Sequence, residues 1–430
     1  MTIRVAYDIA CLGQQVGQLD HKMGIFRVTE EVMYELAKQY SIDLTLVGLC
    51  GEPTISALNC LLYFNNTPDL STHKYVNSLS SRLGLKDLYT KLHATIYLSD
   101  SFYKLPKLSP QALIPRSLFK LLREFDARHF FDDQQVDLLH SPYHKLPSQS
   151  ITKGVPRLLT VHDLIPILAP EFVPPSSTAY LKQTLNSINQ KTDWVVCNSE
   201  YTRQEFCDYT GMSPERTFVT PLAAASHFHP VTDSTQIASV RQRYGIPDGN
   251  YFLSLATLLD PRKNLAHLIR CFFQLLSQHP DLDVNLVLAG SKRVRAEETI
   301  DHPDFARFGS RIIYTGYVAD EDLSAVYSDA TAFIYPSLYE GFGLPPLEAM
   351  KCGTPVITSN TTSLPEVVGN AGILVDPKDE AALGQAMLNL LTDSATVQAL
   401  RQKGFERSQQ FSWAKCTADT VDVYKKIVAS

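Results

Sequence analysis

Short apolar segments alternate with longer amphipathic ones along this 430-residue chain, and this alternation constrains the possible folds more than any other feature. One amphipathic segment, residues 26–40, places Val28, Val32, Leu36 and Tyr40 on one helical face. Strands that alternate with helices favour a parallel, doubly wound α/β sheet. The strands predicted in the first half are residues 3–9, 43–49, 136–142, 157–163, 193–199 and 216–222.

The same pattern restarts after a polar stretch near residues 225–250 that is rich in turn residues. We therefore predict two α/β domains, residues 1–228 and 229–411, with a ligand cleft at the carboxyl ends of their strands. A last amphipathic helix, residues 412–430, could cross back to the first domain. The strands predicted in the second half are residues 251–257, 284–290, 311–316, 331–337, 354–360 and 372–377.

Residues 53–133 do not follow this rhythm and are predicted to be an insertion. Within it, residues 104–131 are locally basic and apolar, so they could touch a lipid surface or an acidic partner. A helix that packs on the domain with its basic side in water is the favoured alternative.

Composition excludes several classes of protein. The net charge of −6 provides no whole-chain basic field for nucleic acid. The eight cysteines are scattered, without a CxxC or a zinc spacing, which favours buried reduced thiols in a cytosolic protein. The first residues are predicted to form a strand rather than a signal peptide, and no run of about 20 apolar residues predicts a membrane span. We expect a cytoplasmic protein, with peripheral contact to the inner face of a membrane as an open possibility.

The stretch YPSLYEGFGLPPLEAMKCGTPVI, residues 335–357, places two glutamates around a turn with two glycines and two prolines. Either proline suits the first residue of a short helix, and Gly353 would end it. Backbone amides at that helix start favour an anion, and Gly341 and Gly343 would let the anion approach. Glu340 and Glu348 could then accept hydrogen bonds from hydroxyls on either side of a phosphate, as in a nucleotide sugar. Taken singly, Glu340 as a solvated loop residue and Glu348 as a helix-start carboxylate favoured by the dipole remain competitive.

The surrounding sequence resembles retaining family-4 glycosyltransferases, which have the twin-Rossmann GT-B fold. The resemblance is carried by EGFGLPPLEAMKCGTPVITSNTTSLPEVVGNAGILVDP, with its glutamate, seven-residue spacing and second glutamate, and by LATLLDPRKNLAHLI. VDLLHSPY, LLTVHDLIP, NSEYTRQEF and GIFRVTEEV are similar to landmarks of the family's first domain. The match is close over residues 136–376, thinner at the N-terminus and absent over about 53–133.

This resemblance implies roles at the donor phosphates. Arg262 and Lys263 would neutralise the diphosphate, whose charge grows as the glycosidic bond breaks. Amides of the glycine-rich turn would bind phosphate and sugar. A backbone amide of Gly24, at the first helix start, could also lie near the phosphates. The turn residues are Gly341, Phe342, Gly343 and Leu344.

The resemblance also assigns residues to the two ends of the donor. Glu340 would hold sugar hydroxyls, Glu348 would hold the ribose, and His162 would contact the sugar near its anomeric carbon. Without the motif, His162 would be read as a core histidine hydrogen-bonded to Asp163. His140 is interpreted as structural or acceptor-side, since the HSPYH spacing to His144 spans a proline and does not suit a metal site.

The predicted function is transfer of a hexose from a nucleotide sugar, with GDP-mannose favoured, to a hydroxyl of a glycan or glycolipid. The resemblance implies retention of anomeric configuration, on one face of the sugar, with the leaving phosphate taking the acceptor's proton. It also implies that no metal or other cofactor is needed. The acidic triplets at 281–283 and 320–322 are accordingly predicted to be a turn and a helix N-cap. A sugar-nucleotide epimerase and a non-catalytic nucleotide-sugar-binding protein remain alternatives, whereas the positions of Glu340 and Glu348 do not imply a two-carboxylate hydrolase.

Overall fold

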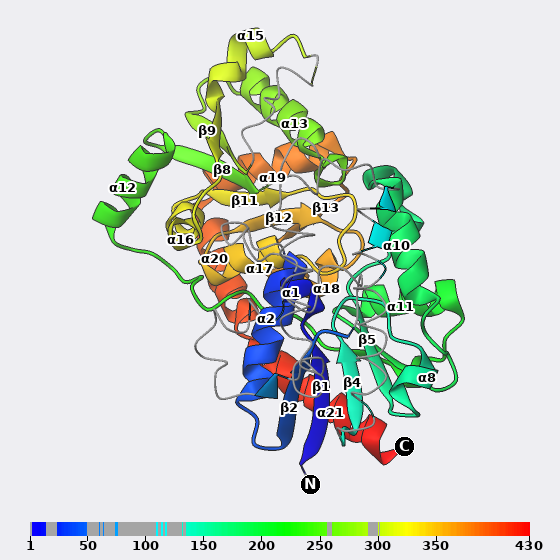
Figure 1. Ribbon diagram of the computed structural model, residues 1–430. Coiled ribbons are helices and arrows are strands. Elements are labelled where there is room, and N and C mark those ends of the chain that lie inside the picture. Colours follow the sequence, from blue (N-terminus) through cyan, green and yellow to red (C-terminus); the bar gives the residue numbers. More distant parts are fainter. Residues whose placement is uncertain are drawn as a thin grey trace.

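A computed structural model describes residues 2–13, 24–49, 135–255, 260–290, 300 and 302–430, with a few positions between 60 and 131 (Figure 1). Most of the predicted insertion, including nearly all of residues 104–131, lies outside the described residues. Its predicted contacts therefore stay predictions. In the part of the chain that is described, no helix is both long and apolar enough to cross a membrane.

The first sheet is entirely parallel, with strand order β3-β2-β1-β4-β5-β6-β7. The order reverses between β1 and β4, which is the switch point where open α/β sheets bind ligands. All six strands predicted in this half are present, and β3 is additional. The strands are β1 (Ile3–Asp8), β2 (Ile42–Val47), β3 (Lys74–Tyr75), β4 (Leu138–Ser141), β5 (Arg157–Val161), β6 (Trp194–Cys197) and β7 (Thr217–Val219).

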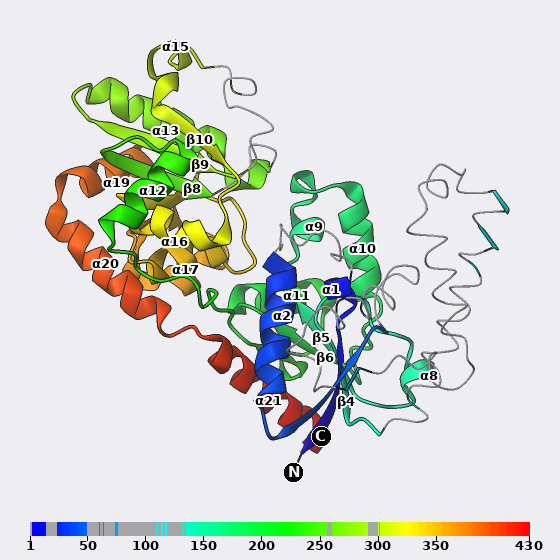
Figure 2. The ribbon, with the colours of Figure 1, turned by 60° about the vertical axis from the view of Figure 1, so that its left-hand side comes forward.

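Helices and short 3₁₀ turns connect these strands and, with the sheet, form what we call the N-terminal domain (Figure 2). Parallel strands need such crossovers because the chain leaves at one end of a strand and must return to the other end of the sheet before the next strand can begin. The described elements are α1 (Ala10–Gly13), α2 (Gly24–Ala37), α8 (Gln149–Thr152), α9 (Ile165–Leu168), η2 (Pro170–Phe172), α10 (Pro175–Leu185), α11 (Glu200–Thr210) and η3 (Pro214–Arg216).

The second sheet repeats the design, with parallel order β10-β9-β8-β11-β12-β13. All six strands predicted in this half are present. They are β8 (Asn250–Leu255), β9 (Val284–Ala289), β10 (Ile312–Gly316), β11 (Ala332–Tyr335), β12 (Val356–Ser359) and β13 (Ile373–Val375). Buried positions on these strands form near-continuous apolar runs, as expected for a sheet covered on both faces.

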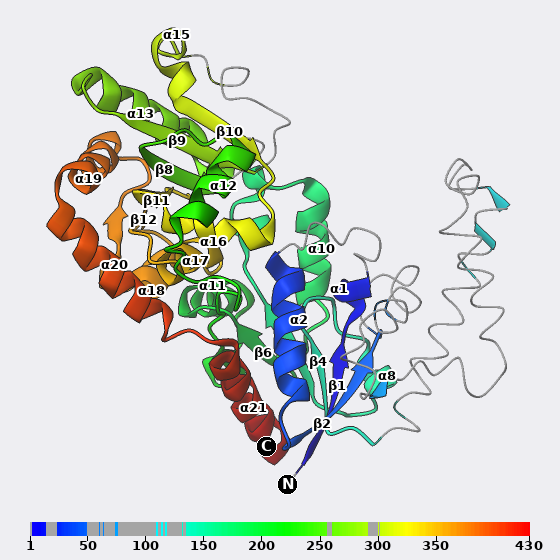
Figure 3. The same cartoon turned by 90° about the vertical axis from the view of Figure 1, so that its left-hand side faces the viewer.

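This second sheet and its helices form what we call the C-terminal domain, and the final helix leaves it (Figure 3). The helices and turns are α12 (Ser234–Tyr244), η4 (Pro261–Lys263), α13 (Leu265–Gln278), α15 (Phe305–Phe308), η5 (Gly309–Arg311), α16 (Asp320–Ser328), α17 (Leu344–Lys351), α18 (Leu364–Val368), η6 (Gly369–Ala371), α19 (Glu380–Thr392), α20 (Ser394–Ser408) and α21 (Trp413–Ala429).

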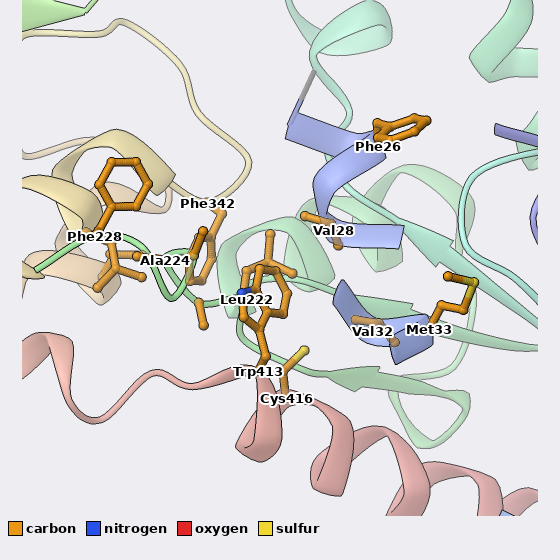
Figure 4. Packing of buried hydrophobic residues seen from close by; sticks show 14 of the residues in the cluster. Phe26, Val28, Val32, Met33, Leu222, Ala224, Phe228, Phe342, Trp413 and Cys416 are labelled. Atoms are coloured by element: carbon orange, nitrogen blue, oxygen red, sulfur yellow. The ribbon is translucent and has the colours of Figure 1, made fainter. Parts of the chain in front are cut away.

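Helix α21 lies against α2, β1 and β4 of the N-terminal domain. Its start is capped by Ser412, whose hydroxyl accepts from the Lys415 amide at 3.1 Å. Trp413 belongs to one buried cluster with Leu222 of the interdomain linker and Phe342 of the C-terminal domain (Figure 4). Because its members come from both domains, this cluster joins them. Burying an aromatic side chain of this size contributes about 2–3 kcal/mol.

The predicted helical face is wrong at one residue. Val28, Val32 and Leu36 are buried, as predicted, but Tyr40 is fully exposed. Helix α2 ends at Ala37, and the chain then turns to enter β2 at Ile42. The 3.6-residue period therefore no longer applies at Tyr40, and its side chain leaves the core face.

The cysteines that the structure describes are free thiols, and all but Cys207 are buried.

Candidate active site

The loop between β11 and α17, residues 336–343, is built for a sharp entry into the helix. Gly343 precedes the helix with φ of 114°, a conformation that side chains other than glycine rarely adopt. Ser363 pins the loop, since its hydroxyl hydrogen-bonds to the carbonyls of Glu340 and Phe342, both at 2.8 Å. Pro345 and Pro346 carry no N–H, so amides for an anion at this helix start come from residues 342–344.

Glu340 is buried at the centre of a charged cluster, so a solvated loop residue does not describe it. Its carboxylate accepts hydrogen bonds from the Tyr335 hydroxyl at 2.8 Å and the Ser337 hydroxyl at 2.7 Å. It also pairs with Arg262 at 2.8 Å and Lys263 at 2.6 Å. Burial alone would raise the pKa of Glu340, but the charges of Lys263 and Arg262 outweigh burial and lower it to about 2. Glu340 is therefore an anion at any physiological pH.

Both cations stand on η4, a turn fixed against the loop. Asp260 caps the turn by accepting from the Arg262 amide at 3.2 Å. Asn264 has φ of 58° and donates through its side-chain amide to the carbonyls of Pro336 at 3.1 Å and Pro377 at 2.7 Å. The Leu338 amide donates to the Arg262 carbonyl at 2.8 Å, which joins turn and loop directly. The PRKN sequence thus places two cations beside the start of α17.

Glu348 lies in the second turn of α17 and is buried, with partners on α16 and α2. The Tyr327 hydroxyl donates to its Oε2 at 3.2 Å, and Arg27 of helix α2 reaches its Oε1 at 3.4 Å. Burial raises the pKa of Glu348 to about 7, against the opposing charge of Arg27. The two glutamates of one short motif therefore sit in opposite electrostatic surroundings.

His162 follows β5 and meets the loop from the N-terminal domain. Its Nε2 lies 2.8 Å from the Pro142 carbonyl oxygen. Burial lowers the pKa of His162, so the imidazole is neutral at pH 7. Because a carbonyl can only accept, Nε2 carries the proton and Nδ1 is left as an acceptor. Asp163 instead accepts from the Ile165 amide at 3.0 Å, so the alternative interpretation, a core histidine bonded to Asp163, does not describe His162.

Gly341 brings the two domains into contact. A β-carbon on Gly341 would lie 2.3 Å from the His162 carbonyl oxygen and 2.8 Å from Cβ of Asp163. The Gly341 carbonyl accepts from the hydroxyls of Ser199 at 2.6 Å and Thr202 at 3.1 Å, both at the start of α11. Gly341 was predicted to let an anion approach the loop. In the structure, the absence of a side chain at Gly341 lets the other domain approach instead.

A pocket of about 680 Å³ opens beside this contact. His162 and Asp163 line it from the N-terminal domain, and Arg262 lines it from the C-terminal domain. Burial raises the pKa of Asp163 to about 6. Tyr143 and Tyr180 form an aromatic wall, with ring centroids 5.8 Å apart. Aromatic faces next to hydroxyl and carboxyl groups suit a sugar, which presents an apolar face and a polar edge.

Two further residues singled out from the sequence lie in the N-terminal domain. Gly24 begins α2, the helix that carries Arg27, and its role at the phosphates stays a prediction. His140 is buried between the Tyr424 hydroxyl at 2.6 Å and the Thr160 hydroxyl at 2.8 Å, contacts that support the structural interpretation.

The acidic triplets have partners of their own. Residues 281–283 lie in the predicted turn before β9, where Asp283 pairs with Arg311 at 2.6 Å. The second triplet is the first turn of α16 rather than its N-cap, which is Ala319. The prediction was one residue off because a run of acidic residues is favoured both at a cap and in a first turn. Within the described residues no group of three or more His, Cys, Asp or Glu side chains is placed to hold a metal ion.

Four residues that complete the site were missed by the sequence argument. Tyr335 and Ser337 stand two residues apart at the end of the strand before Glu340, so strand alternation could have placed them on one face. Tyr327 and Arg27 had no comparable signal in the sequence. Arg27 is 321 residues from Glu348, so no local pattern links these two residues.

GT-B is the class of fold that this pairing of two Rossmann-like domains defines. Solved structures similar over nearly the whole chain agree in fold. Sucrose-phosphate synthase from Thermosynechococcus elongatus matches with a TM-score of 0.64 and 20% identity, covering 99% of both chains. The lipopolysaccharide glycosyltransferase WaaG matches with a TM-score of 0.62 and 13% identity, covering 97% of this chain and 99% of that one.

Sequence comparisons identify the family. Residues 249–393 match the family model described as Glycosyl transferases group 1, and residues 87–223 match Glycosyltransferase Family 4. The O-antigen chain mannosyltransferase B of Escherichia coli is 34% identical over 293 residues, which is 68% of this chain and 75% of that protein. The serotype-specific mannosyltransferase WbdA of E. coli is 33% identical over 63% of this chain and 33% of its own length. This chain belongs to glycosyltransferase family 4.

Proposed function

We propose that this glycosyltransferase moves a mannosyl residue from GDP-mannose to a hydroxyl of a glycan or glycolipid, with retention of anomeric configuration. The observation that carries the proposal is the buried cluster of Glu340, Arg262 and Lys263 at the start of α17, facing His162. The choice of mannose is supported by the names of the relatives, which include mannosyltransferases.

Positive charge for the leaving diphosphate comes from the chain itself. Arg262 and Lys263 are held on η4, and the start of α17 directs amides to the same place. As the glycosidic bond breaks, negative charge on the diphosphate grows and these fixed donors bind it more strongly than in the ground state. We propose that no metal ion is required for this step. Glu340 balances the charge of both cations. When the donor binds, its diphosphate and the Glu340 carboxylate share them.

The sugar end of the donor lies between Glu340 and His162 in this proposal. The neutral His162 can accept a hydrogen bond from a sugar hydroxyl through Nδ1, and the Glu340 carboxylate can accept hydrogen bonds from other sugar hydroxyls. The acceptor occupies the adjacent pocket, against Tyr143 and Tyr180, with its hydroxyl toward the donor. The acceptor oxygen bonds to the anomeric carbon on the same face of the sugar from which the diphosphate departs, so the configuration is retained. The leaving phosphate oxygen takes the proton of the acceptor hydroxyl.

A thermal-shift panel of nucleotides and nucleotide sugars tests the donor, since a ligand that binds only the native state raises its melting temperature. We expect GDP and GDP-mannose to give the largest shifts. Incubation with GDP-mannose alone then separates the alternatives. A transferase makes no epimerised donor, an epimerase makes it without an acceptor, and a binding protein makes no product with any acceptor. NMR of the new anomeric centre tests retention.

A further inference from the structure

Arg27 is the residue through which the N-terminal domain reaches the buried glutamate of α17. It stands in the first turn of α2, the helix whose N-terminal end points toward α16 and α17 (Figure 2). Its Nη1 lies 3.4 Å from Glu348 Oε1, and its Nη2 lies 2.7 Å from Asp320 Oδ2 at the start of α16. The Arg27 side chain is 16% exposed and that of Glu348 8%, so little solvent screens the pair.

The contacts on Glu348 leave its carboxylate with unused hydrogen-bonding capacity. Arg27 takes one oxygen of the carboxylate and the Tyr327 hydroxyl takes the other. An ionised carboxylate has about four lone-pair sites, so each oxygen can accept one more hydrogen bond. Two vicinal hydroxyls, such as those of a ribose, match this arrangement. The second carboxylate, Asp320, holds the other arm of the guanidinium and fixes its plane.

We propose that Arg27 is a positioning residue for donor binding: it holds Glu348 as an oriented anion, so the ribose end of the site is complete only when the two domains meet. This inference rests on the proposed function, because it takes the ligand of Glu348 to be a ribose. It adds a residue from the opposite domain to a ribose subsite otherwise built from Glu348 and Tyr327 of the C-terminal domain.

Charge on Glu348 gives the proposal a signature that simple packing lacks. Burial raises the pKa of Glu348 to about 7 while Arg27 lowers it, so removing Arg27 moves the pKa higher. At pH 7.5 a larger fraction of Glu348 would then be protonated in the variant, and a protonated carboxyl accepts hydrogen bonds from hydroxyls poorly. Nucleotide affinity should recover as pH rises and the carboxylate ionises.

Other groups around Glu348 do not mimic this behaviour. Tyr327 on α16 keeps its proton because burial raises its pKa, and burial raises the pKa of Cys352 to about 12. Burial lowers the pKa of Lys351 on α17, so rising pH removes a positive charge there and would weaken nucleotide binding. Burial also lowers the pKa of His227, which faces Arg27 from the linker and is neutral above pH 7. Asp320 is the remaining charged neighbour, and its contact with Arg27 is lost in the same substitution.

The test is calorimetric titration of GDP into the full chain at pH 6.5, 7.5 and 9. For Arg27→Met we expect affinity at least tenfold weaker than wild type at pH 7.5, with the gap closing at pH 9. Arg27→Lys, which keeps the charge, should recover part of the affinity, and Glu348→Gln should bind weakly at every pH. Arg243→Met is the matched control, because Arg243 also pairs with the first turn of α16, with Asp322 at 2.6 Å, within the C-terminal domain.

Two results would overturn the inference. Arg27→Met could bind GDP like wild type at pH 7.5, or it could lose the same factor at pH 7.5 and pH 9, which would indicate a direct phosphate contact or a packing effect instead. Both outcomes leave the proposed function intact. A wild-type chain that binds no nucleotide at any pH would contradict both the proposed function and this inference. Melting curves of each variant confirm that the titrated chain is folded.

Discussion

Gly341 and His162 meet so closely across the domain boundary that a β-carbon on the glycine would lie 2.3 Å from the histidine carbonyl oxygen. The contact joins the loop between β11 and α17 of one domain to the end of β5 in the other. It fixes the two halves of the site against each other without any charged pair.

Gly341→Ala should disrupt this contact, because the atom in the way is backbone and cannot move aside. We expect activity to fall roughly 100-fold, the order seen when a remote change displaces a site by about 1 Å. Gly384→Ala is the control: nothing lies within 4 Å of its β-carbon position in α19, so helix propensity should raise stability by about 0.5–1 kcal/mol with full activity. Steady-state kinetics and thermal unfolding measure both. An active Gly341→Ala enzyme would contradict the contact.

Glu340→Gln should destabilise the fold at neutral pH by about 3 kcal/mol, because it leaves Lys263 buried without its counter-charge and Arg262 paired with Asp260 alone. The sign with pH follows from the depressed pKa. Glu340 contributes stability above its ordinary pKa of 4.5, and that contribution is lost as pH falls toward 2. Denaturant unfolding at several pH values should show a smaller acid dependence in the variant. Glu200→Gln, in an exposed pair with Arg203, should change stability by less than about 0.5 kcal/mol; an equal effect from both variants would argue against the buried cluster.

Glu348→Gln should stabilise the ligand-free protein at pH 8. The pKa of Glu348 is raised from 4.5 to about 7, so folding at alkaline pH must bury a carboxylate that is already ionised in the unfolded chain, and stability falls as pH rises from 4.5 to 7. Removing the charge should recover about 1–3 kcal/mol at pH 8 and almost nothing at pH 4.5. GDP affinity should fall at least tenfold in the same variant. Melting temperatures at both pH values check the first part, and a lower value at pH 8 would count against it.

His162→Ala should separate catalysis from nucleotide binding. The side chain lies at the sugar end of the proposed donor site, so kcat should fall roughly 100-fold while the Kd for GDP stays within about threefold. His279→Ala, at an exposed position after α13, is the control and should leave both constants unchanged. A loss confined to GDP affinity would move His162 away from the reacting centre.

Local sequence pattern was sufficient for the elements of the fold. Parallel strands buried on both faces read as apolar runs, and helices carry a period of 3.6, so both are visible within windows of a few residues. Tyr40 shows where this stops, since the pattern continued past the point where the chain turned. The buried state of Glu340 and Glu348 was not visible either, because burial depends on what lies above a residue in space.

The sequence by itself determined that two parallel α/β domains form, that a glycine-rich turn opens into a helix between two glutamates, and that a basic pair follows the first strand of the second domain. Only the tertiary structure decided which charges meet. Lys263 holds Glu340 from 77 residues away, with Arg262 beside it, and Arg27 holds Glu348 from 321. Pairing over such separations follows from how sheets and domains pack, and it leaves no period or spacing in the chain. That packing gives one glutamate a pKa of about 2 and the other a pKa of about 7.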